Sequence, residues 1–102
     1  MIDRPLGSAH PRHGFIYPVN YGYVPSVTAP DGNGLDAYFL GVDEPLNEAE
    51  GICVGIIHRR NDDDDKLVVT PEGLDLSDEA ILGAVHFQER WFDSVLLRPP
   101  AV

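Results

Sequence analysis

The sequence has little cysteine, little positive charge and no long apolar run, and each shortage excludes a class of protein. A single cysteine, Cys53, excludes an intramolecular disulfide and a zinc site built from cysteines. Seven Lys and Arg stand against 17 Asp and Glu, and the formal charge of -10 argues against nucleic acid or an anionic membrane as partner. No apolar run approaches the about 18 residues of a membrane span, and no signal peptide is recognisable. We therefore expect a cytoplasmic protein that binds neither nucleic acid nor membrane.

The remaining composition is that of a small globular fold. The chain has 102 residues, of which 43% are hydrophobic and 24% charged, and we expect a single domain over residues 1–102. A domain of this size buries only roughly 60–65% of its unfolded surface, so its core is thin and self-association would bury more apolar surface. Candidate contacts of such a homo-oligomer are Trp91, Phe92 and residues 95–97, although core packing explains them equally well.

The local patterns predict a mainly β domain of the α+β class. Residues 3–34 are rich in Pro and Gly, which predicts loops and short extended pieces. Three β-branched or aromatic runs, 37–42, 51–58 and 66–70, predict strands. Ser77 is a plausible helix N-cap, and apolar residues recur at helical spacing from Ile81 to Phe92. This order predicts a small, mostly antiparallel sheet or barrel with one late helix packed against it.

Acidic residues gather in two places that could hold a cation. Asp31 and Asp36 flank a Gly-rich turn, and carboxylates on a tight turn can converge on a hard cation such as Mg²⁺. Four consecutive aspartates, 62–65, either complete that site or form a solvated loop. Lys66 follows them, where its ammonium could reach a substrate phosphate. Turn dipeptides alone would also explain the first cluster.

Aromatic and basic residues near the N-terminus could face an anion. Tyr17, Tyr21 and Tyr23 surround a Pro and a Gly; their default role is core packing, but a phenol can also donate to a phosphate oxygen. Arg4 and Arg12 could hold an anionic substrate bidentately. Cys53 is interpreted as a buried small hydrophobic residue. The four histidines are interpreted as structural or surface residues: His10, His13, His58 and His86.

Taken together, these segments resemble the soluble inorganic pyrophosphatases of the single-domain, Mg²⁺-dependent kind. Residues 17–25 look like that family's Tyr-Pro-x-Asn-Tyr-Gly-aromatic stretch, and residues 29–36 follow at the expected distance and resemble its signature Asp-x-Asp-Pro-x-Asp. Residues 64–71 are similar to its later Asp-x-Lys strand ending in Pro. Asp3-Arg4 resembles its Asp-Arg pair, and residues 86–89 resemble part of its C-terminal helix. The resemblance covers roughly residues 3–92, and landmarks in the right order are more specific than any one of them.

The resemblance implies a five-stranded barrel with one C-terminal helix and a polyanion site at the barrel mouth. It implies Mg²⁺ as cofactor, with Mn²⁺ or another divalent cation as substitutes, held by Asp31, Asp36 and Asp64. Asp62 would supply a further metal carboxylate, although Asp63 or Asp65 fits equally, because a run of four aspartates leaves the register open.

The resemblance also implies a small-molecule substrate, inorganic pyrophosphate, which is hydrolysed to phosphate. The residues matching the family's phosphate-binding positions, and thus the expected catalytic side chains, are Arg4, Tyr21 and Lys66.

Three departures from the family pattern keep a second hypothesis open. Asn33 stands where the family has the middle signature Asp, and an amide cannot act as a base; Gly34 replaces the signature Pro. Trp91-Phe92 stands where the family has a Tyr-Lys pair, so one phosphate-binding cation is lost. The chain is therefore either a divergent pyrophosphatase or a non-catalytic protein that binds divalent cations or a phosphorylated ligand. A small interaction domain with a solvated acidic loop is a third possibility.

Overall fold

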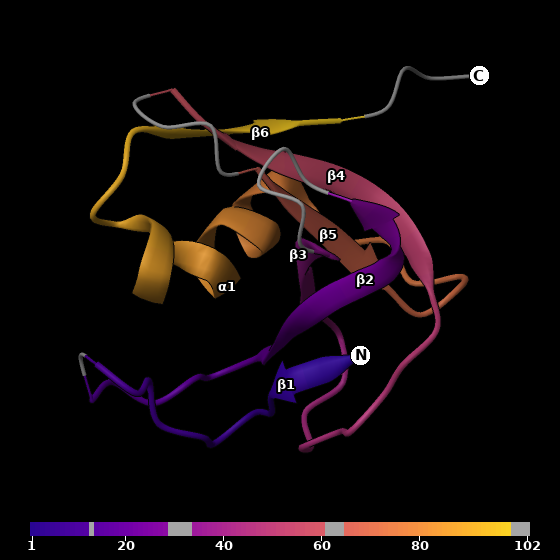
Figure 1. Ribbon diagram of the computed structural model, residues 1–102. Helices are drawn as coiled ribbons and strands as arrows, with labels where there is room; N and C mark the ends of the chain where they lie inside the picture. Colours follow the sequence, from indigo (N-terminus) through magenta and orange to yellow (C-terminus); the bar gives the residue numbers. More distant parts are fainter. Residues whose placement is uncertain (13, 29–33, 61–64, 99–102) are drawn as a thin grey trace.

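The computed structural model describes residues 1–12, 14–28, 34–60 and 65–98, which form one sheet and one helix (Figure 1). The elements are β1 (Ile2–Arg4), β2 (Asn20–Thr28), β3 (Gly34–Phe39), β4 (Ile52–Arg59), β5 (Lys66–Thr70), α1 (Asp78–Glu89) and β6 (Ser94–Leu97). The strand order is β1-β2-β3-β5-β4-β6. Among the strands that the structure describes, only β3 and β5 pair in parallel, and all other neighbours are antiparallel. The predicted mainly β fold with one late helix is confirmed.

The sheet differs from the expected barrel in strand number and in closure. The described strands number six, not five, and β1 and β6 are the two edges of an open sheet. The additional strand β6 follows the helix and pairs with β4, with Leu97 opposite Ile56 and Ser94 opposite Arg59. Residues 95–97, predicted as contacts of a homo-oligomer or of the core, thus complete the sheet by pairing with β4.

Strand β2 was not predicted, because its sequence is rich in turn-forming residues. It nevertheless runs for nine residues between β1 and β3. A Cβ on Gly22 would lie 2.0 Å from the backbone oxygen of Met1, so glycine permits the close approach of β1. The pairing of β2 with β3 shifts register between Val24 and Thr28, the interval that contains Pro25. Pairing on both sides therefore outweighs the local turn preference.

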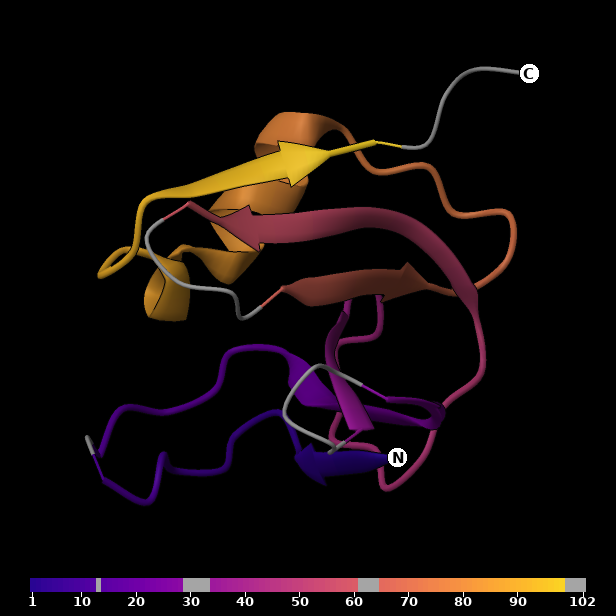
Figure 2. The same cartoon turned by 45° about the horizontal axis from the view of Figure 1, so that its top comes forward.

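Helix α1 covers one face of the sheet. The predicted N-cap is confirmed, since Ser77 Oγ accepts a hydrogen bond from Ala80 N at 3.1 Å. Ile81 and Val85 are buried against Tyr38 and other apolar strand residues. Figure 2 shows β6, β4 and β5 side by side with α1 behind them. In the part of the chain that the structure describes, no helix is long and apolar enough to cross a membrane.

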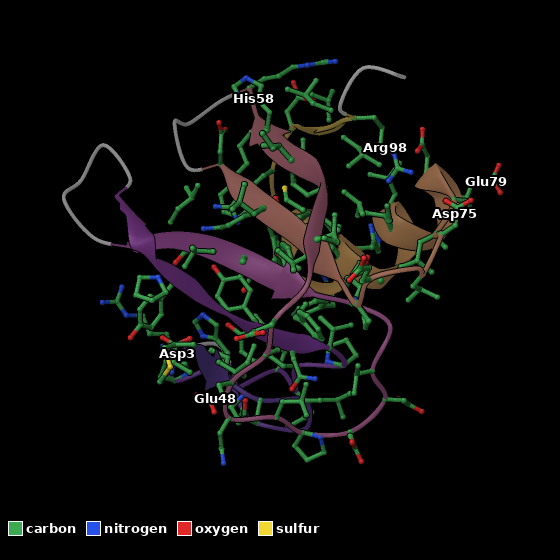
Figure 3. All side chains as sticks on the ribbon, turned by 90° about the vertical axis from the view of Figure 1, so that its right-hand side faces the viewer. Asp3, Glu48, His58, Asp75, Glu79 and Arg98 are labelled. Atoms are coloured by element: carbon green, nitrogen blue, oxygen red, sulfur yellow. The ribbon has the colours of Figure 1, made fainter. Side chains whose placement is uncertain are left out.

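The helix is shorter than its apolar spacing predicted. It ends at Glu89, with Arg90 as C-cap, so Trp91 and Phe92 lie beyond it. Glu89 is buried on the face that the prediction assigned to apolar residues. Arg98, which follows β6, ties that edge to the start of the helix: its Nε lies 3.4 Å from Asp78 Oδ1, and Figure 3 shows Arg98 on the same side as Glu79.

Cys53 is exposed, and the prediction that it is buried was wrong. The pairing of β4 with β5 shifts register between Cys53 and Gly55. Every second residue of β4 faces inward, so Gly55 and Ile57 are buried. The register shift interrupts this alternation before Cys53, which therefore does not face inward.

A long excursion separates β1 from β2 and stands out from the sheet on the side where α1 ends (Figures 1 and 2). Its two arms hold each other through backbone bonds such as Tyr17 N to Ser8 O at 2.8 Å and His10 N to Phe15 O at 2.7 Å. Asn20 closes its base: the fully buried amide accepts from Leu6 N at 3.0 Å and donates to Glu44 O at 2.9 Å. The excursion is thereby held as one wall of a cleft.

Candidate active site

A cleft of about 610 Å³ opens between this excursion, the sheet and the residues that follow α1. It is lined by Asp3, Arg4, His10, Phe15, Tyr17, Tyr21, Asp36, Arg59, Lys66, Gln88, Trp91 and Phe92. Three of the chain's seven Lys and Arg residues are among them, against two carboxylates. The cleft therefore gathers a large share of the few cations of a chain whose formal charge is -10.

Strand register brings four predicted site residues into this cleft. Arg4 of β1 and Tyr21 of β2 are Cα partners. Strands β3 and β5 run in parallel with Ala37 opposite Leu67, so the preceding residues, Asp36 and Lys66, are neighbours. The Nζ of Lys66 donates to Asp36 Oδ2 at 2.7 Å and lies 5.9 Å from the centroid of the Tyr21 ring. Residues from four strands thus converge, as far as 62 positions apart in sequence.

Lys66 is the deepest of these groups. Its side chain is only 3% exposed, whereas that of Asp36 is 38% exposed. A buried ammonium is costly without a charged partner, and the Asp36 carboxylate supplies that partner. The cleft floor therefore carries a poorly solvated cation whose charge water screens weakly.

The other predicted metal ligands cannot be placed. Asp31, Asp62 and Asp64 lie outside the described residues, as do Asn33 and Asp63. Within the described ranges, no group of three or more His, Cys, Asp and Glu side chains could hold a metal ion. The metal site thus stays a prediction in which Asp36 is the one member with a described position.

Two residues with open assignments, Asp65 and Arg12, are not among those that line the cleft. Asp65 Oδ1 lies 2.8 Å from His58 Nδ1, and both side chains are about two-fifths exposed. Figure 3 shows His58 at the opposite end of the molecule from Asp3. Arg12 is exposed and is not among the residues that line the cleft.

A buried ion pair supports the cleft from the helix side. The Nε of Arg59 donates to Glu89 Oε1 at 2.9 Å and its Nη2 to Oε2 at 2.8 Å, and both side chains are about 5% exposed. Glu89 also accepts from Tyr38 Oη at 2.6 Å and from Ser94 Oγ at 2.9 Å. Burial acts to raise the pKa of Glu89, but the hydrogen bonds and charge of Arg59, with the bonds from Tyr38 and Ser94, hold it below its usual value. The carboxylate is therefore charged at neutral pH.

Arg59 reaches the cleft while it is held by Glu89, and its guanidinium carbon lies 3.6 Å from the centroid of the Phe92 ring. No motif or spacing in the sequence singles out Arg59. The alternation of the strand places Arg59 on the same inward face as the apolar Ile57, two residues before it. A cation buried at such a position needs a charged partner from elsewhere in the fold.

Neutral donors continue this network across the floor. Tyr17 Oη donates to Gln88 Oε1 at 3.1 Å, and Gln88 Nε2 donates to Tyr38 Oη at 2.8 Å. Burial, and to a lesser extent the charges of Asp3 and Asp36, raise the pKa of Tyr17 despite the opposing effect of Arg4. Burial and the charge of Glu89 raise the pKa of Tyr38 far above its usual value. Both phenols therefore remain protonated donors.

The chain matches no protein-family model, and no curated protein matches its sequence. Solved structures do match. An inorganic pyrophosphatase from Coxiella burnetii superposes with a TM-score of 0.61 at 23% identity, over 93% of this chain and 80% of that one. The inorganic pyrophosphatase from Helicobacter pylori gives 0.58 at 24% identity, over 97% and 67% of the two chains. One from Ehrlichia chaffeensis gives 0.60 at 19% identity, over 81% and 62%. With its six-stranded sheet and C-terminal helix, this chain therefore has the fold of the inorganic pyrophosphatases, as a short and divergent representative.

Proposed function

We propose that this chain hydrolyses phosphoanhydrides, inorganic pyrophosphate in the first instance, with Mg²⁺ as cofactor. The observation that carries the proposal is the convergence of Arg4, Tyr21 and Lys66 beside the Asp36 carboxylate in one cleft. A chain with a formal charge of -10 repels a polyanion over most of its surface, so a cleft lined by several cations is where one would bind.

The proposed magnesium ion would arrive with its substrate, because the described residues alone form no group that could hold a metal ion. Mg²⁺ is usually held by one or two carboxylates and substrate phosphates, and it keeps several waters. Asp3 and Asp36 line the cleft and offer two carboxylates. Asp31, Asp62 and Asp64 are proposed as further ligands from the sequence resemblance. When bound, the ion supplies charge neutralisation on the phosphates and lowers the pKa of a water.

The chain's own side chains would bind and orient the two phosphates. Lys66 exchanges its Asp36 partner for a phosphate oxygen, and its low exposure makes this interaction strong. Arg4 offers a planar guanidinium that binds phosphate bidentately, and the Tyr21 phenol adds a hydrogen bond. Because all three stand on paired strands, they need little reorganisation as charge develops on the leaving phosphate.

One observation favours the alternative, a non-catalytic protein that binds divalent cations or a phosphorylated ligand. Lys66 and Asp36 already neutralise each other at 2.7 Å, so substrate binding must first break an ion pair. The residues after the helix are Trp91 and Phe92, which bring no further cation.

A phosphate-release assay with pyrophosphate and Mg²⁺ separates the two. We expect metal-dependent turnover in the native chain, and a loss of about 10- to 100-fold in kcat/KM in Lys66→Gln, since a hydrogen bond to a charged group contributes about 1.5–3 kcal/mol. The matched control is Arg12→Gln, an exposed cation outside the cleft, which should keep full activity. Magnesium binding without any turnover would leave only the binding protein; equal losses in both variants would contradict the placement of the site.

The compartment and assembly belong to the same proposal. We place the protein in the cytoplasm, where the exposed thiol of Cys53 would stay reduced. Light scattering should show a homo-oligomer, since the apolar Leu97 on the edge strand β6 leaves 50% of its surface exposed.

A further inference from the structure

A row of aromatic rings connects the cationic floor of the cleft to the molecular surface. The Nζ of Lys66 lies 5.9 Å from the Tyr21 ring, whose centroid is 5.6 Å from that of Tyr17. The centroid of Tyr17 lies 5.5 Å from Phe15, and that of Phe15 lies 5.7 Å from Trp91 with the two rings stacked. Trp91 is 53% exposed, so the outer end of the row is open to solvent.

Inorganic pyrophosphate does not account for this row. It consists of two charged phosphate groups and has no apolar surface to place against an aromatic wall. Yet five of the nine aromatic side chains line this one cleft: Phe15, Tyr17, Tyr21, Trp91 and Phe92. A volume of about 610 Å³ is that of a pocket for a whole organic small molecule. A half-exposed tryptophan at the mouth is also not explained by core packing.

We propose that the cleft takes a nucleoside diphosphate, a phosphoanhydride that carries a planar aromatic base. This inference rests on the proposed function and specifies its substrate class. The two phosphates would lie at Arg4 and Lys66, and the base would lie against the exposed surface of Trp91, beside Phe15. The guanidinium of Arg90 lies 4.3 Å from the Trp91 centroid and would share that ring with the base.

The corresponding hydrolysis balances without a further reactant. Water adds to the β-phosphorus, and the bond between that phosphorus and the bridging oxygen breaks. The bridging oxygen leaves with the nucleoside monophosphate, orthophosphate is the second product, and the proton released passes to solvent.

Trp91 makes the proposal directly measurable, because it is the only tryptophan in the chain. We expect adenosine diphosphate with Mg²⁺ to quench Trp91 fluorescence, while inorganic pyrophosphate binds without this quenching. Stacking on an aromatic side chain contributes an affinity factor of about 5 to 100 per base. By calorimetry, Trp91→Ala and Phe15→Leu should therefore weaken adenosine diphosphate binding within this range and leave pyrophosphate affinity unchanged.

Phe15→Leu removes the aromatic ring but keeps an apolar side chain at this position. It should therefore fold even if Trp91→Ala does not. Leu82→Ala is the matched control: it is an apolar side chain on α1, 43% exposed and outside the cleft lining, and it should alter neither affinity.

The outcomes distinguish this inference from the proposed function. Pyrophosphate turnover with no binding of adenosine diphosphate would overturn the nucleotide site and leave the pyrophosphatase. Equal weakening of both ligands in Phe15→Leu would likewise overturn it, because the wall would then be structural. Quenching by adenosine diphosphate without hydrolysis of either compound would support the nucleotide site and reject the hydrolytic function.

Discussion

The buried carboxylate of Glu89 provides the most demanding test of how this fold is stabilised. Replacing it by glutamine keeps the size of the side chain but removes the negative charge that Arg59 faces at 2.8 and 2.9 Å. The native carboxylate accepts hydrogen bonds from Arg59, Tyr38 and Ser94. The amide nitrogen of glutamine can only donate, so it would face a donor without an acceptor.

The expected cost follows from the burial of both partners, which are 6% and 5% exposed. Removing one member of a buried ion pair leaves the other charge without compensation and costs about 3–5 kcal/mol. Domains of this size have free energies of unfolding of about 5–15 kcal/mol, so Glu89→Gln should lose a large part of the stability. With about 4–8 °C per kcal/mol, the melting temperature should fall by at least about 12 °C.

Thermal and urea unfolding followed by circular dichroism would measure the effect. The matched control is Arg60→Gln, one residue further along, whose ion pair with Asp93 is 3.7 Å long with both side chains 60% exposed. Such exposed pairs contribute about 0–1 kcal/mol, so the control should unfold close to the native chain. A Glu89→Gln variant that is no less stable than Arg60→Gln would refute the assignment of this pair to the core.

The same carboxylate predicts a pH dependence of stability. In the folded protein the pKa of Glu89 lies below its ordinary value of 4.5. The contribution of this carboxylate to the free energy of unfolding is therefore fully present above about pH 4.5, and it is lost as the pH falls through the pKa of the folded state. The native chain should therefore lose stability on acidification over this range, and Glu89→Gln should lose less. Parallel acid-unfolding curves for the two proteins would contradict this.

Three further predictions concern the cleft and the sheet edge. Asp36→Asn should weaken Mg²⁺ binding measured by calorimetry, because the cation loses a charged ligand, and unchanged affinity would remove Asp36 from the site. Asn33→Asp should raise the rate of pyrophosphate hydrolysis if a missing base limits it, and a flat response would place water activation elsewhere. Gly22→Ala should lower the melting temperature, because its methyl group would lie 2.0 Å from Met1 O and displace β1; an unchanged value would mean that β1 adjusts freely.

Local patterns identified the elements whose sequence agrees with their final environment. The runs 51–58 and 66–70 became β4 and β5 with nearly the predicted ends, because short β-branched stretches between turns or charges favour a pleated, half-buried strand. Ser77 and the acidic first turn located the start of α1, since capping involves only neighbouring residues. The resemblance to inorganic pyrophosphatases added the fold and named Arg4, Tyr21, Asp36 and Lys66, which the structure brings into one cleft.

Contacts between distant segments decided the features that these patterns did not predict. Strand β2 exists because β1 and β3 supply hydrogen bonds on both sides, which no turn propensity within residues 20–28 reveals. Strand β6 is likewise defined by β4, and the exposure of Cys53 by a register shift against β5.

What the sequence by itself determined is the secondary structure that short-range forces control, the acidic charge and the identity of four residues that line the cleft. Only the tertiary structure decided that Arg59 would meet Glu89 across 30 positions and that rings from the excursion would line up with Trp91. The physical reason is that the energy of an ion pair or of stacked rings depends on distance and burial in space. Neither quantity is encoded in any local window of the chain.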